Sequence, residues 1–246
     1  MYASPNRRVV SHAVPMVGYL RGAALRSPLD LSFSFASEQV IDTLARSAGI
    51  DPLIFRRNNI ADPRWLGVLN AAAAAAGLSS GLPRPSRGGD IATGWGIGLG
   101  THHVSYGAAV AEIEINKRTG VIVAKRLYGA LDAGLVVNPA LVENQIVGQM
   151  VQATSRVLKE EVIFDKSNVT SVDWASYPVL RFAEHPDVVP VAVQRMEEPS
   201  TGAGEEVMGA TAAAIANAFF DATGVRLYQY PMTPPRVLAA LAANRT

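Results

Sequence analysis

The chain has 246 residues, enough to bury a substantial hydrophobic core as one large domain or two small ones. Its 22 Lys and Arg nearly balance its 21 Asp and Glu, so a formal charge of +1 leaves no basic surplus for binding nucleic acid. The absence of cysteine excludes disulfides, thiolate zinc sites, a cysteine nucleophile and any iron–sulfur cluster ligated by this chain. No apolar run is long enough for a membrane span, and residues 1–10 do not resemble a signal peptide.

The first part of the chain is predicted to be helical. Apolar residues recur at helical spacing over 33–48, and Gly49 supplies a left-handed stop. Asp51-Pro52 and Asp62-Pro63 each place a capping carboxylate before a proline at the first helical position. Two short helices should follow them, and we assign residues 1–78 to a helical N-terminal section.

A sheet is predicted after a connecting segment. Residues 79–93 are rich in Pro, Gly and Ser and show no hydrophobic periodicity, which is typical of a linker. Strands are predicted over 94–104, 107–115 and 121–131, and the motif NKRTG forms the turn between the last two.

Further helices and a second β-rich passage follow. Asn138-Pro139 opens a long helix, and residues 164–196 are predicted to be rich in strand. A final long helix is predicted over 207–223, and Thr233-Pro234 begins a short terminal helix. We therefore predict an α+β fold with helices packed on a mixed or antiparallel sheet, in which residues 94–246 form the second domain.

The segment STGAGEE, residues 200–206, places small residues and two carboxylates at the start of the last long helix. Its glycines allow a ligand to approach the backbone, and free N–H groups in a first helical turn bind anions or oxo groups. Alternatively, Glu205 and Glu206 only complement the helix dipole, which the pattern alone favours. However, the following helix is apolar all round and hence buried, so its first turn would be desolvated and a carboxyl pKa raised. The helix dipole lowers that pKa, which leaves the sign of the net shift open.

An amide strip is predicted on the helix after Pro139. Gln145, Gly148, Gln149 and Gln152 share one face, and carboxamides suit the edge of a pterin. A solvated polar stripe is an equally good interpretation.

Two arginines precede the first helix. Arg21 and Arg26 lie in a predicted loop, and arginine suits bidentate contacts to phosphate or carbonyl oxygens. A solvated loop arginine is the commoner case.

Three other motifs fit no site. GLSSG at 77–81 matches a nucleophile elbow but follows a helix instead of a strand. GWGIGLG at 94–100 has glycine at every second residue, which predicts a close-packed strand and no dinucleotide site. His102 and His103 should point to opposite sides of a strand, which is poor for binding one metal.

Together and in this order, the segments resemble the molybdopterin-binding large subunits of the xanthine dehydrogenase/aldehyde oxidase family, C-terminal half. The bacterial aldehyde, nicotinate and isoquinoline oxidoreductases are the most similar branch. The resemblance is carried by LRGAALRSP (20–28), FASEQVID (35–42), DPLIFRRNN (51–59), AAVAEIEINKRTG (108–120), LDAGLVVNPALVENQIVGQMVQ (131–152), WASYPVLRF (174–182) and GAGEEVMGATAAAIANA (202–218).

The resemblance implies a cofactor and the residues that serve it. The cofactor would be molybdenum on a pyranopterin, as molybdopterin or molybdopterin cytosine dinucleotide, with no metal ligand from this chain. The family's glycine–glutamate pair falls on Gly204 and Glu205, which implies that Glu205 is the catalytic base. Gln145 and Arg21 fall on cofactor-contacting positions, and Gly204 is likewise implied to bind the cofactor. The family's glycine–glutamate–proline is changed here, which makes Glu206 a rival base.

The resemblance also implies a reaction and partners. The reaction would hydroxylate an aldehyde or N-heterocycle with oxygen from water, and electrons would pass through a two-cluster iron–sulfur subunit to an FAD or cytochrome subunit. The cofactor-binding G-G-x-F-G and G-Q-G segments of complete subunits are not found. We therefore expect the cofactor to be shared with an upstream chain or segment, and the chain alone to be inactive. The expected compartment is the cytoplasm, or the periplasm if a partner carries an export signal.

Two other functions compete with this one. A non-catalytic interaction or assembly module would keep the fold without the chemistry. A hydrolase that uses Ser79 would turn over esters without molybdenum, which the context of that serine disfavours.

Overall fold

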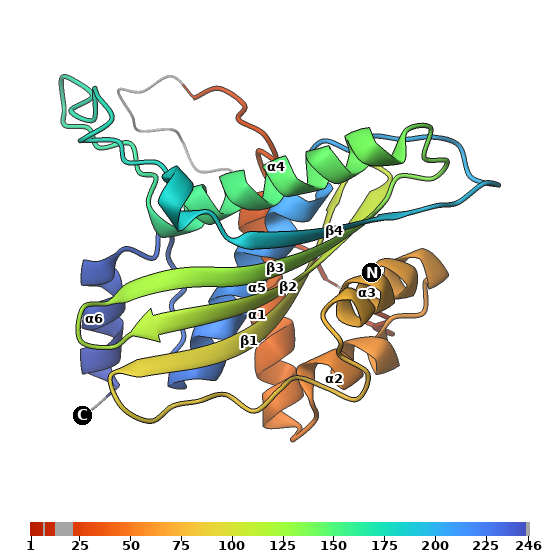
Figure 1. Ribbon diagram of the computed structural model, residues 1–246, viewed down its shortest axis with the longest axis horizontal. Helices are drawn as coiled ribbons and strands as arrows, with labels where there is room; N and C mark the ends of the chain where they lie inside the picture. Colours follow the sequence, from red (N-terminus) through yellow and green to blue (C-terminus); the bar gives the residue numbers. More distant parts are fainter. Residues whose placement is uncertain (7, 13–21, 245–246) are drawn as a thin grey trace.

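The computed structural model describes residues 1–6, 8–12 and 22–244. Its elements follow one another along the chain as Figure 1 shows. They are α1 (Asp30–Ser47), α2 (Pro52–Asn59), α3 (Pro63–Ala75), β1 (Ile91–His102), β2 (Ser105–Asn116), β3 (Val121–Asp132), α4 (Pro139–Leu158), a 3-10 turn (Phe182–Glu184), β4 (Asp187–Val193), α5 (Glu206–Thr223) and α6 (Pro234–Ala243). Within the described ranges, no helix is long and apolar enough to cross a membrane.

The four strands form one mixed sheet in the order β1-β2-β3-β4. The first three are antiparallel neighbours, and β4 lies parallel to β3. A parallel neighbour needs a crossover, which α4 and the segment after it provide. The predicted α+β class is confirmed.

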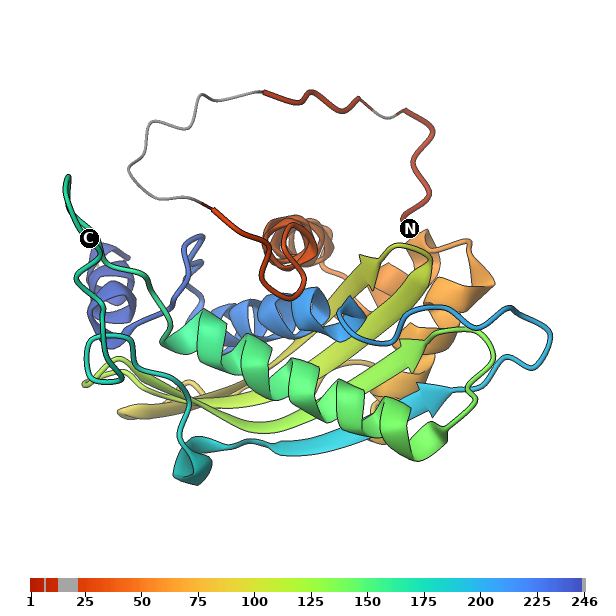
Figure 2. The ribbon, with the colours of Figure 1, turned by 90° about the horizontal axis from the view of Figure 1, so that it is seen from above.

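Helices cover both faces of the sheet. On one face α5 packs on β1 and β2 while α4 packs against β3 and β4, and α3 packs on the opposite face. Figure 2 shows α1 on the side of α5 that is turned away from the sheet. Residues before and after the predicted linker 79–93 share one hydrophobic cluster, and the proposed division into domains stays a prediction.

Most predicted helix boundaries are confirmed, because local capping signals set them. Asp51 accepts hydrogen bonds from the first amides of α2, and Asp62 does the same for α3. Asn138 caps α4 through the amide of Leu141 at 3.2 Å. Gly224 ends α5 with a left-handed φ of 75°.

The alternating glycines of β1 bring α5 into backbone contact with the sheet. A Cβ added to Gly94, Gly96 or Gly98 would lie 2.2–2.3 Å from a carbonyl oxygen of α5. The facing residues of α5 are alanines, so helix and strand meet without large side chains between them. The predicted close-packed strand is thus confirmed. The alanines in contact are Ala210, Ala213, Ala214, Ala218 and Ala222.

Two predictions about strands were wrong in extent. β1 begins at Ile91, inside the predicted linker, because its first residues pair with the end of β2. The predicted β-rich passage over 164–196 contains only β4, the 3-10 turn and one isolated bridge between Phe164 and Val169. Its apolar residues were misleading, since many of them are exposed instead of paired in a sheet; Trp174 is an example.

Candidate functional site

The loop before α5 is fixed by the hairpin of β1 and β2. The carbonyl oxygen of Glu206 lies so close to Gly100 and Gly107 that a Cβ on either would be 2.6 Å from it. Ser105 Oγ donates a hydrogen bond of 2.6 Å to the carbonyl of Gly202. The small residues of the hairpin therefore determine where α5 starts.

Gln149 of α4 holds the same loop from the other side. Its buried side chain donates from Nε2 to the carbonyl of Ala203 at 2.9 Å and accepts at Oε1 from the amide of Val207 at 2.7 Å. One carboxamide thus satisfies two backbone groups on either side of the α5 start. This member of the predicted amide strip is structural.

Arg26 occupies the rest of the amide strip. Its Nε donates to the carbonyl of Gly204 at 2.5 Å, and its other nitrogens donate to Oε1 of Gln145 at 2.7 Å and of Gln152 at 3.4 Å. The guanidinium lies against α4 at Gly148, 3.6 Å from where a Cβ would be. Burial lowers the pKa of Arg26, while Glu205 and Glu206 oppose that effect. The interpretation of the strip as solvated is therefore wrong for the buried Gln149, whereas Gln152 is partly buried and Gln145 is exposed.

The two neighbouring glutamates point in different directions. Glu205 has a side chain that is 29% exposed, and its Oε2 accepts from the amide of Ser27 at 2.8 Å. Glu206 is 1% exposed, and its Oε2 accepts from the amide of Glu205 at 2.9 Å. Burial raises the pKa of Glu206. The predicted desolvated carboxylate is therefore Glu206, and Glu205 is the one that a ligand can reach.

His102 joins Glu205 to the start of α1. Its Nδ1 lies 2.7 Å from Oδ2 of Asp30, and its Nε2 lies 3.3 Å from Oε2 of Glu205. The hydrogen bond with Asp30, followed by the charges of Glu205, Asp30 and Glu206, raises the pKa of His102 against the opposing effect of burial. A protonated imidazole donates from both nitrogens, which is what two carboxylates require.

The two adjacent histidines do not point to opposite sides, as the strand periodicity had predicted. Their ring centroids are 4.1 Å apart. The strand ends at His102, and His103 adopts a left-handed φ of 52° in the turn that follows. The alternation of side chains therefore stops between the two residues.

The structure gathers most of the predicted site residues. Gln145 and Gly204 are joined through Arg26, and Glu205 follows directly in the chain. Arg21 lies outside the described residues. The sequence patterns did not predict that His102 contacts Glu205, because the two residues lie about a hundred positions apart in the chain. The contact becomes visible only when the fold brings the charged groups together.

The loop suits an oxygen-rich ligand. The amides of Gly202, Ala203 and Gly204 donate to no other described residue, and no atom lies within 4 Å of where a Gly204 Cβ would be. Free N–H donors beside an open glycine and a reachable carboxylate fit a pterin or an oxo group. In the part of the chain that the structure describes, no three His, Cys, Asp or Glu residues are placed to hold a metal.

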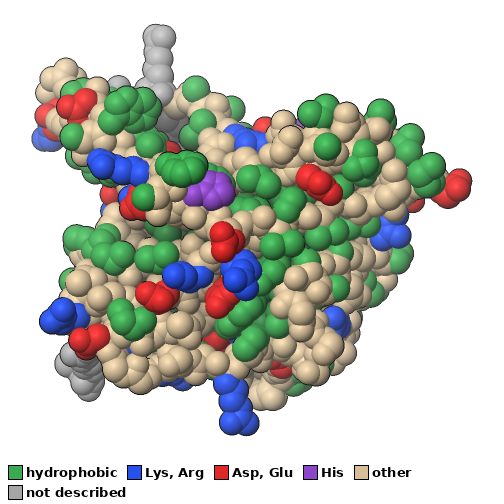
Figure 3. Space-filling model, in the orientation of Figure 1, with side chains coloured by type: hydrophobic (Ala, Val, Ile, Leu, Met, Phe, Trp, Pro, Cys, Tyr) green, Lys and Arg blue, Asp and Glu red, His purple; other side chains and the backbone are tan. Residues whose placement is uncertain are grey.

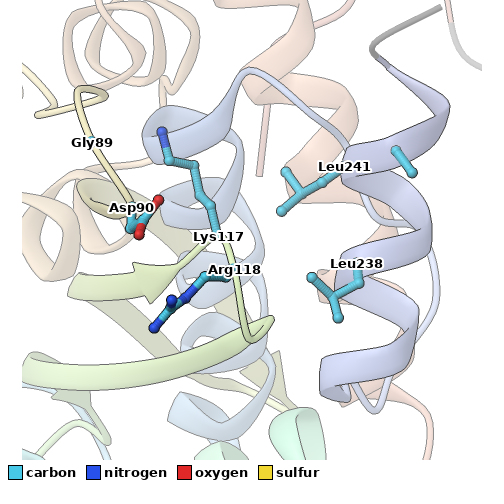
Figure 4. A pocket seen from close by; sticks show the side chains of 7 residues that line it. Gly89, Asp90, Lys117, Arg118, Leu238 and Leu241 are labelled. Carbon is cyan, nitrogen blue, oxygen red and sulfur yellow. The ribbon is translucent and has the colours of Figure 1, made fainter.

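A cavity of about 500 Å³ lies elsewhere in the molecule. Figure 4 shows Asp90, Lys117 and Arg118 on one side of it and α6 on the other. It adjoins the turn after Asn116, whereas Ser105 at the opposite end of β2 contacts the loop before Glu205. The cavity is therefore separate from the candidate site.

Comparison with known proteins shows what this chain is similar to. Residues 86–186 match the molybdopterin cofactor-binding domain, a range that ends before the 200–206 loop. A nicotinate dehydrogenase subunit of Pseudomonas putida is 39% identical over 97% of this chain, and the beta subunit of isoquinoline 1-oxidoreductase of Brevundimonas diminuta is 28% identical over 89%.

A solved structure shares the fold. The aldehyde oxidoreductase of Desulfovibrio gigas superposes with a TM-score of 0.69 at 17% identity, over 90% of this chain and 42% of that one. This chain spans only 21% and 27% of the nicotinate and isoquinoline enzyme subunits.

Proposed function

Because the chain resembles the molybdopterin-binding subunits of the xanthine dehydrogenase/aldehyde oxidase family in sequence and fold, we propose that it forms one wall of a molybdopterin site. The enzyme would hydroxylate an aldehyde or N-heterocycle. The observation that carries the proposal is the reachable carboxylate of Glu205 beside an open, donor-rich loop.

Two groups would hold the cofactor, and a third would position them. The free amides of residues 202–204 would donate to its oxygens, Gln145 would offer its Nε2, and Arg26 would keep both in place. Arg21 remains a proposed contact through the family resemblance alone. When bound, the molybdenum–pterin group supplies the two-electron oxidation for which water is the oxygen source. The pterin would be molybdopterin or its cytosine dinucleotide form.

Glu205 would act as the general base. Its Oε2 is held by the Ser27 amide and by His102, while Oε1 has no hydrogen-bond partner among the described residues. Oε1 is therefore the atom that would accept a proton during the reaction. A protonated His102 would donate from Nε2 to Oε2 of Glu205 and so help to orient the carboxylate.

The remaining wall of the site would come from a complementary chain or segment. Relatives are several times longer than this chain, which is why we expect no turnover from the chain alone. Electrons would leave through a two-cluster iron–sulfur subunit to FAD or a cytochrome. We propose a cytoplasmic assembly, with the periplasm as the alternative.

A chimera tests the function. This chain would replace the matching segment of the Pseudomonas putida nicotinate dehydrogenase subunit, and molybdenum, pterin and nicotinate oxidation would be measured. We expect bound molybdenum and turnover, and a loss of about 10²–10⁴-fold in kcat for Glu205→Gln with molybdenum retained. Glu114→Gln, on the sheet face away from α5, is the matched control. Full turnover by Glu205→Gln would refute the catalytic role, and a chimera without molybdenum would favour the non-catalytic module.

A further inference from the structure

Helix α1 turns its charges inward. Glu38 and Asp42 are completely buried, and Glu38 Oε2 lies 3.0 Å from Arg56. Arg46 bonds Asp42 at 2.8 Å and also reaches Asp221 of α5 at 3.0 Å. Asp30, the remaining charged residue of the helix, contacts His102 as described above. The side of a helix that carries its ion pairs is usually the solvated side, so this orientation is the reverse of the ordinary one.

The outer side of α1 is apolar and uncharged. Leu29 precedes the helix, and Phe33, Val40 and Leu44 follow at spacings that place them on the same face. Each of these four residues is 50–64% exposed. The other exposed residues of α1 have neither charge nor large polar groups: they are Ser32, Ala36, Ser37, Thr43 and Ser47. We call Leu29, Phe33, Ala36, Val40 and Leu44 the α1 stripe.

Such a stripe is typical of the centre of an interface. Burying one large apolar side chain contributes about 1.5–3 kcal/mol, and interface centres are depleted of charged residues. The face seen in Figure 3, which carries α4 and β4, instead has acidic and basic side chains distributed among the apolar ones. Charge is therefore absent from the outer side of α1 in particular and not from the surface in general.

The position of the stripe indicates what covers it. Leu29 lies two residues after Ser27, whose amide holds Glu205, and Asp30 contacts His102. A partner on the stripe would therefore lie beside the open side of the candidate site. The relatives are more than three times as long as this chain, so they contain additional protein that could fill this position.

We infer that the α1 stripe is the docking surface for the part of a molybdopterin-binding subunit that this chain does not contain, and that this part presents an uncharged apolar surface to it. The inference rests on the proposed function in one respect, since it takes the partner to be the complementary wall of the same site. It adds the surface through which the two parts join.

A split version of the assembly tests this docking. The probe is the Pseudomonas putida nicotinate dehydrogenase subunit without the segment that matches this chain, and its Kd for the intact chain is measured. We expect Phe33→Asp with Val40→Asp to weaken binding by about tenfold or more. Trp174→Asp with Phe182→Asp, which changes two exposed aromatic residues far from α1 in sequence, should leave the Kd unchanged.

The outcomes separate the docking from the catalytic proposal. Unchanged binding by the α1 variant, or no binding by the intact chain, would overturn the inference. So would self-association of the intact chain that the α1 variant abolishes, because the stripe would then join two copies. Far-UV circular dichroism and thermal unfolding verify that each variant is folded. Glu205→Gln should keep the wild-type Kd, so a failure of the catalytic role leaves the docking result intact.

Discussion

The backbone amide of Ser27 donates a hydrogen bond of 2.8 Å to Oε2 of Glu205, although 178 residues separate the two in the chain. The bond joins the segment before α1 to the start of α5. Because the donor belongs to the backbone, a side-chain change at position 27 leaves it in place. One oxygen of Glu205 is thereby fixed, and the other is left for a ligand.

His102 should make stability depend on pH. Its pKa is raised in the folded protein. Its contribution to the free energy of unfolding is therefore complete below the pKa of the unfolded chain, about 6.5, and is lost as the pH rises through the higher pKa of the folded protein. We expect the thermal midpoint to fall over that interval, and His102→Gln to remove this part of the fall. His185→Gln should retain it. NMR titration of the His102 ring gives the pKa directly, and a value at or below 6.5 would contradict the prediction.

Arg26→Lys should loosen the loop before α5. A single ammonium group cannot donate to both Gly204 and Gln145 with the geometry of the guanidinium. We expect a loss of about 1 kcal/mol in local stability, seen as roughly fivefold faster hydrogen exchange of the bonded amides of Glu205, Val207 and Met208. Arg126→Lys, at an exposed position on β3, should leave exchange there unaltered. Equal exchange in both variants would show that Arg26 does not hold the loop.

Gly96→Ala should destabilise the packing of α5 on β1. The new Cβ would lie 2.2 Å from the carbonyl oxygen of Ala214, so helix or strand must move. We expect a loss of about 3 kcal/mol in the free energy of unfolding, measured by urea denaturation. Gly88→Ala is the control, since its Cβ would meet nothing within 4 Å. Similar stability of the two variants would be inconsistent with direct backbone contact.

Arg56→Met should be more damaging than its combination with Glu38→Gln. Both side chains are fully buried, and burial raises the pKa of Glu38 although Arg56 opposes the effect. Removing only the arginine leaves a buried carboxylate unpaired, which costs about 3–5 kcal/mol. The double variant has no such charge, and we expect it to recover part of the loss. A double-mutant cycle by chemical denaturation measures the coupling, and additive losses would indicate that the pair is not coupled.

Local signals made most of the fold predictable, and distant contacts made the rest unpredictable. Asp51 and Gly224 act on neighbouring amides, so sequence alone located the ends of α2 and α5. The prediction of a β-rich passage failed because a strand needs a neighbouring strand to pair with, and within that passage only β4 joins the sheet, beside β3.

The candidate site was likewise predictable only where its residues are neighbours in the sequence. Gly204 and Glu205 were recognised within one short motif, whereas the roles of Arg26 and His102 depend on residues far away in the chain. The spacing on α4 showed that its amides share a face but not that Arg26 occupies it.

The glycines of β1 restrict where residues can be inserted or deleted. Four residues of helix rise about 6 Å, and two residues of strand rise about 6.6–6.8 Å. Because these distances are similar, alanines at every fourth position of α5 lie opposite glycines at every second position of β1. One extra residue in either element would misalign the glycine–alanine contacts that follow it, and the start of α5 would rotate or shift. Differences in length between related chains should therefore be found in the loop between α4 and the 3-10 turn, and be rare over 94–100 and 206–222.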